Sequence, residues 1–150
     1  MKQLSPRTEK NIATLVPKAQ AAARAFMAQA AIALEGLDIT VEIICGTRTY
    51  AEQDALYAKG RTAPGVKVTN ARGGFSNHNF GIAWDIGLFR AGRYLEESRV
   101  YRQLGKLAGP LGLEWGGEWV SFPDEPHYQL RTGLTLAQLR SLISQGKSIV

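Results

Sequence analysis

The segment from Gly73 to Phe89 (GGFSNHNFGIAWDIGLF) constrains the fold of this chain more than any other. It contains one of only two histidines, His78, and a carboxylate, Asp85, follows seven residues later. One continuous helix is excluded, because Gly81 and the hydrophobic run Ile82–Phe89 are typical of a bend that leads into a strand. We therefore predict that His78 projects from a loop and that Asp85 projects from the strand beside it.

The predicted strand 82–89 has two unlike faces, because successive side chains of a strand point to opposite sides. The carboxylate shares its face with small side chains, which leave room for a ligand to approach it. Large apolar side chains occupy the other face and suit a protein core. The first face comprises Ala83, Asp85 and Gly87, and the second comprises Ile82, Trp84, Ile86 and Leu88.

The second histidine, His127, lies in the segment FPDEPHYQL, three residues after Asp124. Pro126 restricts Glu125 to an extended conformation. Asp124 and His127 would lie on opposite faces of a regular strand. We therefore predict a bend before Pro126 that brings both side chains to one site.

Two histidines with neighbouring carboxylates match the donors of a catalytic zinc site, which uses three protein ligands and keeps one position open for water. We assign His78, Asp85 and His127 as the candidate ligands of one zinc ion. By spacing alone, two structurally satisfied histidines are the alternative interpretation, because lone histidines are more often structural than metal-ligating.

Hydrolysis at such a site needs a base, because a zinc-bound water has its pKa lowered toward about 7 and must lose a proton. Asp124 is our candidate to accept that proton and to return it to the leaving amine. Glu118 and Glu125 are the other carboxylates nearby. Arg48, expected between the end of a strand and the start of a helix, is a candidate to stabilise an oxyanion or to hold a substrate carboxylate.

The length of 150 residues indicates one domain, 1–150, with no second domain and no repeat. Apolar periodicity and capping signals such as Thr49-x-x-Glu52 indicate both helices and strands. We predict helices near 6–15, 17–35, 50–59, 95–107 and 136–143. We predict strands near 37–45, 66–69, 82–89 and 127–130.

The net charge of +5 favours anionic partners. The basic residues are spread along the chain without a run, which argues against a nucleic-acid-binding function. The single cysteine, Cys45, excludes an intramolecular disulfide and is expected to be a small buried side chain. We find neither a signal peptide nor an apolar run of about 20 residues that could span a membrane.

The pattern Ser76-x-His78-x-x-Gly81-x-Ala83-x-Asp85 resembles the SxHxxGxAxD signature of the zinc D,D- and L,D-peptidases of the M15 family, which are related to VanY and to the hedgehog fold. Two further segments resemble the L-alanyl-D-glutamate endopeptidases of phage endolysins and bacterial cell-wall hydrolases within that group. They are Gly46-Thr47-Arg48-Thr49, with Gln53, Leu56-Tyr57 and Gly60-Arg61, and the segment Trp115-Gly116-Gly117-Glu118-Trp119 that leads to Asp124 and His127.

This resemblance implies a single α+β domain in which helices flank a small antiparallel sheet that carries the zinc site. It implies one Zn²⁺ per chain on His78, Asp85 and His127, with Asp124 as the catalytic carboxylate and Arg48 polarising the substrate. The residues expected to bind substrate are Ser76, Gln53, Trp115, Glu118, Trp119 and Tyr128. Gln129 stands where relatives often carry glutamate.

The implied activity is hydrolysis of the peptide stem of peptidoglycan between L-Ala and D-Glu. Two alternatives are a D,D- or L,D-carboxypeptidase with the same metal site and a non-catalytic cell-wall-binding module. The resemblance to compact phage endolysins further implies a monomer that is made in the cytoplasm and reaches the cell wall after release, through a holin.

Overall fold

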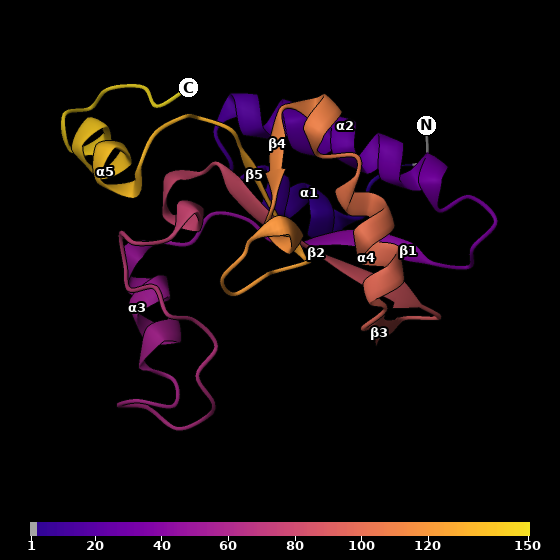
Figure 1. The fold of residues 1–150 in the computed structure, drawn as a ribbon, viewed down its shortest axis with the longest axis horizontal. Coiled ribbons are helices and arrows are strands. Elements are labelled where there is room, and N and C mark those ends of the chain that lie inside the picture. The colour runs from indigo at the N-terminus through magenta and orange to yellow at the C-terminus, as the bar shows by residue number, and fades with distance from the viewer. Residues whose placement is uncertain (1–2) are drawn as a thin grey trace.

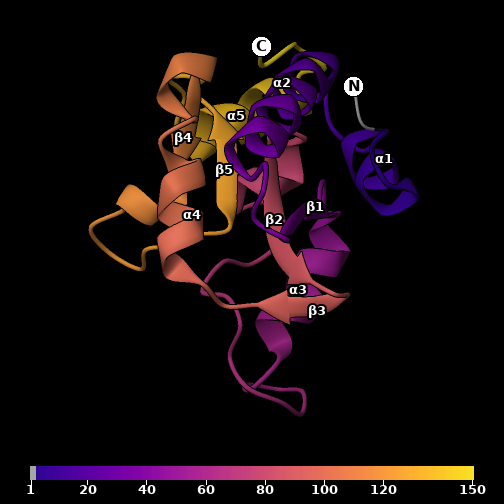
Figure 2. The same ribbon diagram turned by 90° about the vertical axis from the view of Figure 1, so that its right-hand side faces the viewer.

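A five-stranded antiparallel sheet organises residues 3–150, the part of the chain that this computed structural model describes (Figures 1 and 2). Met1 and Lys2, which belong to the predicted domain 1–150, lie outside the described residues. The strand order is β1-β2-β5-β4, and β3 pairs with the end of β2. The strands are β1 Thr40–Cys45, β2 Ala83–Arg90, β3 Arg93–Leu95, β4 Leu113–Trp115 and β5 His127–Leu130.

Helices flank this sheet on both sides. In both views α2 lies above the sheet, whereas α3 and the loop that follows it hang below it (Figures 1 and 2). The α-helices are α1 Pro6–Ile12, α2 Pro17–Ala33, α3 Tyr50–Ala58, α4 Ser98–Gly105 and α5 Leu136–Ser144. Three short 3₁₀-helices are η1 Asn77–Phe80, η2 Gly109–Leu111 and η3 Gly116–Glu118.

Local capping signals set the starts of α1, α3 and α5, as the sequence predicted. The Ser5 hydroxyl accepts a hydrogen bond from the Thr8 N–H, and Pro6 takes the first position of α1. Capping boxes open α3 at Thr49 and α5 at Thr135. The expected single α+β domain with a small antiparallel sheet is confirmed.

Two sequence predictions of secondary structure are wrong. Residues 66–69 form no strand, and Val66 and Val68 are exposed without a neighbouring strand among the described residues. The segment 95–107 begins as a strand, because a turn at Ala91-Gly92 folds β3 back onto β2 and delays the start of α4 to Ser98.

The core lies between the sheet and α2. The ring of Phe26 from α2 lies 4.4 Å from the ring of Tyr128 on β5, and Trp84 on β2 stacks on the same tyrosine. Trp84, Ile86 and Leu88 are fully buried, so β2 has the apolar face that its alternation predicted. Burial of each such side chain contributes about 1.5–3 kcal/mol to folding.

Helix α1 covers the open edge of the sheet. The Thr8 hydroxyl accepts a hydrogen bond from the backbone N–H of Ile43 (3.1 Å), and the Asn11 amide donates to the Ile43 carbonyl (2.8 Å). These side chains satisfy backbone groups of the edge strand β1 that would otherwise be free to pair with another chain. No helix of the described residues is long and apolar enough to cross a membrane.

Candidate metal centre

The sheet face opposite α2 carries the candidate metal site. Asp85 on β2 pairs directly with His127 on β5, and both side chains point away from the core face. His78 comes from η1, which follows a capping box between Ser76 and Asn79 and ends at Gly81. Gly81 has φ 72°, and a Cβ there would lie 3.0 Å from a methyl group of Val16. The expected placement of Asp85 on a strand is therefore confirmed, whereas His78 projects from the short 3₁₀-helix η1 and not from the expected loop.

Three donor atoms converge in front of this face. The Nε2 of His78 lies 3.2 Å from the Oδ1 of Asp85 and 3.2 Å from the Nδ1 of His127. The third side of the triangle, from His127 Nδ1 to Asp85 Oδ1, is 3.1 Å. Tetrahedral zinc with bonds of about 2.0–2.1 Å would separate its ligand atoms by about 3.3–3.4 Å. The triangle is therefore close to one face of a zinc coordination tetrahedron.

The outer nitrogens of both imidazoles are held by oxygen acceptors. The Nδ1–H of His78 donates to the carbonyl of Gly46 (2.8 Å), and the Nε2–H of His127 donates to the Oε1 of Gln129 (2.8 Å). These bonds direct an unprotonated nitrogen of each ring toward Asp85. Three electron-pair donors facing one another require a cation between them, so the donor set and its outer hydrogen bonds fit a metal ion.

The pKa shifts of Asp85 and His127 also show that this site favours positive charge. Burial alone would raise the pKa of Asp85, but hydrogen bonds with His127 and His78 hold it far below its usual range. Burial alone would lower the pKa of His127, but the adjacent Asp85 carboxylate raises it above the usual value. The pair of Asp85 and His127 therefore binds a proton more strongly than an ordinary histidine does, and a metal ion would compete with that proton.

Asp124 approaches the same site from the loop before β5. One of its carboxylate oxygens belongs to a cluster of donor atoms, with Asp85 and His127, that lie within 4.8 Å of one another. Its backbone N–H donates to the carbonyl of Gly116 (2.9 Å), and its carbonyl accepts from the N–H of His127 (3.2 Å). Desolvation and the charge of Asp85 raise the pKa of Asp124. The predicted bend that brings Asp124 to His127 is therefore present.

The two other carboxylates of this region lie elsewhere. Glu125 accepts a hydrogen bond from the Ser98 hydroxyl (2.6 Å) and lies 3.8 Å from Arg102, so it points toward α4, away from Asp124, as expected. Glu118 is exposed at the end of η3. Among the three, Asp124 is the carboxylate that the fold brings to the histidines.

The backbone of Arg48 is hydrogen-bonded to the η1 segment that carries His78. Its N–H donates to the carbonyl of His78 (2.9 Å), and its carbonyl accepts from the amide of Asn79 (2.9 Å). The Nε of Arg48 is buried and has no hydrogen-bond partner among residues 3–150. The positive charge lies close enough to counteract the rise in the pKa of Asp124. Arg48 thus has an unused buried donor beside the candidate base.

Cys45 lies at the edge of the site. Its sulfur is 3.9 Å from the Nδ1 of His78, and the side chain is half-buried. Burial, together with the negative charge of Asp85, raises the pKa of the Cys45 thiol to about 11. The thiol therefore stays protonated near neutral pH and is a poor nucleophile.

Three residues expected to bind substrate are buried, which corrects that expectation. Tyr128 is fully buried on the core face, because alternation along β5 turns it away from His127. Gln53 is fully buried and donates to the carbonyl of Ala71 (2.9 Å). Trp115 packs in the core and donates to the carbonyl of Glu125 (2.7 Å). Each has a structural role.

The other expected substrate contacts lie nearer the site. The Ser76 hydroxyl caps η1 by accepting from the N–H of His78. The ring of Trp119 lies 4.9 Å from the ring of His127. Glu118 is exposed on the adjacent turn. These three remain candidates for substrate contact.

Asn77 and Glu114, two polar residues behind His127, were not identified from the sequence as part of the site. The Oε1 of Gln129 accepts from His127 and from the amide of Asn77 (3.0 Å). The Nε2 of Gln129 donates to Glu114 (3.3 Å), whose other oxygen accepts from the Trp119 indole N–H (2.8 Å). The sequence signal that could have pointed to them is Gln129, which lies two residues after His127 and therefore on the same strand face.

Comparison with known proteins agrees with this geometry. Residues 69–130, which include all three candidate ligands and Asp124, match the D-alanyl-D-alanine carboxypeptidase group of M15 peptidases. The chain carries an M15 peptidase domain. The chain is also 40% identical over 112 residues to the peptidoglycan L-alanyl-D-glutamate endopeptidase CwlK of Bacillus subtilis (strain 168). That match covers 68% of this chain and 66% of CwlK, just under two thirds of the relative's length.

Solved structures extend the likeness to most of the chain. The L-Ala D-Glu endopeptidase ChiX of Serratia marcescens is 25% identical with a TM-score of 0.59, and the match covers 87% of this chain and 90% of ChiX. The vancomycin-resistance D,D-pentapeptidase VanY, solved with Zn(II), is 18% identical with a TM-score of 0.54. The match covers 90% of this chain and 81% of VanY and shows a shared fold.

Proposed function

We propose that this chain is a zinc peptidase that hydrolyses the peptide stem of bacterial peptidoglycan between L-Ala and D-Glu. The observation that carries the proposal is the triangle of donor atoms from His78, Asp85 and His127, with sides of 3.1–3.2 Å. The activities of CwlK and ChiX, to which the chain is similar, support the choice of substrate and bond.

His78, Asp85 and His127 would hold one zinc ion through two nitrogens and one carboxylate oxygen. Bound zinc supplies a Lewis acid for the scissile carbonyl and lowers the pKa of water. The hydrogen bonds from the two histidines to Gly46 and Gln129 orient the ligand rings before the metal binds.

Asp124 is the group that moves the proton. Its raised pKa suits a base that accepts a proton from the attacking water and then gives it to the leaving amine. Arg48 offers its unpaired Nε–H and its positive charge to the oxygen on which negative charge develops. The two side chains thus divide proton transfer and charge stabilisation between them.

Mass spectrometry of purified muropeptides, digested with and without a zinc chelator, tests this proposal. The endopeptidase releases the stem that begins with D-Glu and leaves L-Ala on the sugar. A D,D-carboxypeptidase, the activity for which the matched family is named, or an L,D-carboxypeptidase would instead release a single terminal D-amino acid. A non-catalytic wall-binding module would leave the muropeptides intact but would still sediment with peptidoglycan.

The biological setting is part of the same proposal. By its resemblance to phage endolysins, the chain acts in lysis as a monomer and reaches the cell wall through a holin. Co-expression in a bacterial host tests the route: lysis with a holin, and none without it, is the expected outcome. Lysis without a holin would contradict it.

A further inference from the structure

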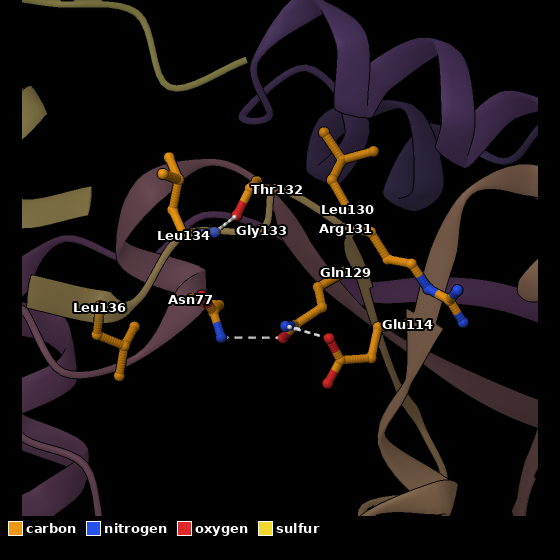
Figure 3. Close-up of a pocket in the computed structure, with 9 residues that line it drawn as sticks. All are labelled: Asn77, Glu114, Gln129, Leu130, Arg131, Thr132, Gly133, Leu134 and Leu136. Atoms are coloured by element: carbon orange, nitrogen blue, oxygen red, sulfur yellow. Dashed lines mark hydrogen bonds between the residues drawn. The ribbon is translucent and has the colours of Figure 1, made fainter. Parts of the chain in front are cut away.

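A cavity of about 340 Å³ lies beside the candidate metal centre (Figure 3). One wall is polar and is formed by Asn77, Gln129 and Glu114, which are joined by hydrogen bonds. Leu134 and Leu136 lie on the opposite side, at the start of α5. Gln129 also bonds to His127, so this cavity shares a wall with the metal centre.

Glu114 is the only acidic residue that lines the cavity. It is half-buried, and each carboxylate oxygen accepts one hydrogen bond from a neutral donor, Gln129 or Trp119. A carboxylate has roughly four acceptor positions, so about two stay open. No Lys, Arg or His nitrogen of residues 3–150 lies within 4.0 Å of it. Arg131 also lines the cavity, but it is exposed and its guanidinium points away from Glu114 (Figure 3).

Carboxylates that are removed from water are usually paired with a cation in proteins. A neutral side chain with an acceptor oxygen could serve Gln129 and Trp119 equally well, so the negative charge of Glu114 has no partner among residues 3–150. This unpaired charge indicates that a cation from outside the chain completes the site. The leucine wall indicates that this cation is attached to an aliphatic chain.

We propose that this cavity is a subsite for an ammonium group on an aliphatic side chain of the substrate, with Glu114 as its anionic partner. A peptide stem that contains a diamino acid after D-Glu carries such a group. Leu134 and Leu136 would contact the methylene groups of that side chain. The identification of the peptide as substrate rests on the proposed function.

The distance along the sheet suits this assignment. Glu114 pairs with Gln129, two residues along β5 from His127. Strand geometry separates the Cα atoms of Glu114 and His127 by about 8 Å, from two residues at ~3.4 Å along the strand and one ~4.8 Å step across it. An extended peptide spans at most ~3.3–3.6 Å per residue. The subsite therefore lies two to three residues from the metal centre, which a diamino acid next to D-Glu reaches.

Calorimetry with two synthetic peptides tests the subsite. Both have the sequence N-acetyl-L-Ala-γ-D-Glu-L-Lys, and in one the lysine ammonium is acetylated. Binding is measured to zinc-loaded Asp124→Asn protein, so that cleavage does not interfere. We expect the free ammonium to bind about tenfold more tightly, as one charge-assisted hydrogen bond predicts. Glu114→Gln, combined with Asp124→Asn, should abolish that preference. Glu96→Gln in the same background, which changes an exposed carboxylate outside the cavity, should keep it.

Equal affinity for the two peptides, or no binding of either, would overturn the subsite. A preference that survives Glu114→Gln would also overturn it. So would a Glu114→Gln variant that binds both peptides more weakly by the same factor, because Glu114 would then only support Gln129 and Trp119. Cleavage by the unmodified chain is measured separately. Selective binding without cleavage would contradict the proposed peptidase and leave the ammonium subsite standing.

Discussion

Asp85 and His127 lie directly opposite each other on antiparallel strands, and the carboxylate Oδ1 of Asp85 is 3.1 Å from the Nδ1 of His127. The two residues are 42 positions apart in the chain, so the register between β2 and β5 creates the contact. A slip of one residue would turn one of the two side chains into the core. The metal site therefore depends on strand pairing as well as on the choice of ligands.

Loss of either histidine should remove the metal. In His78→Ala or His127→Ala, two ligand atoms remain, and we expect zinc content by elemental analysis to fall from one per chain to near zero. Glu96→Gln, a substitution at an exposed position, is purified in the same way and should keep one zinc per chain. Full zinc content in either histidine variant would show that the ligand set is wrong.

Zinc binding should weaken as the pH falls. The pKa of His127 in the metal-free site is raised by Asp85, so this imidazole keeps its proton to a higher pH than an ordinary histidine. The proton must leave before a metal binds, and affinity is therefore lost as the pH decreases through that raised pKa. Titration with a chromophoric zinc chelator at a series of pH values measures this. A pH-independent affinity would contradict it.

Arg48→Lys should lower turnover by about tenfold or more and leave zinc bound. Lysine keeps the charge but lacks the planar group whose Nε–H is buried and unpaired here. Muropeptide cleavage rates and zinc content, measured on the same preparation, separate the two effects. Near-normal turnover in the variant would reduce Arg48 to a structural residue.

Asp124→Asn should lower the cleavage rate by ~10²–10⁴-fold, because it removes the proton acceptor without changing the size of the side chain. Zinc content and melting temperature should stay close to those of the unmodified chain. Glu118→Gln is the comparison, because Glu118 is the exposed carboxylate on the neighbouring turn. An inactive, zinc-loaded Glu118→Gln beside an active Asp124→Asn would transfer the role of base to Glu118.

Gln129→Glu should destabilise the protein. The Gln129 amide donates to Glu114 at 3.3 Å, and a second carboxylate at that distance would replace a hydrogen bond by repulsion. We expect a loss of ~1–3 kcal/mol in the free energy of unfolding, measured by urea denaturation. The double variant with Glu114→Gln should recover most of that loss. Additive effects would show that the two side chains do not interact.

Several features were determined by short stretches of sequence alone. The caps at Ser5, Thr49 and Thr135 are local hydrogen bonds, and the apolar alternation of β2 follows from strand geometry. Gly81 marked the bend between the segment that carries His78 and the strand that carries Asp85. Each depends on residues close together in the chain, so periodicity and turn chemistry predict it.

Only the tertiary structure decided which side chains meet. It placed Tyr128 in the core against Phe26, although the sequence suggested a substrate contact. It joined Asn77 to Gln129 across 52 positions, and the β4–β5 register brought Glu114 beside Gln129. Such contacts depend on which strands pair and in which register, which is settled by burial of the whole apolar face. No local pattern encodes that choice, and the environment of the metal centre emerges only when the chain has folded.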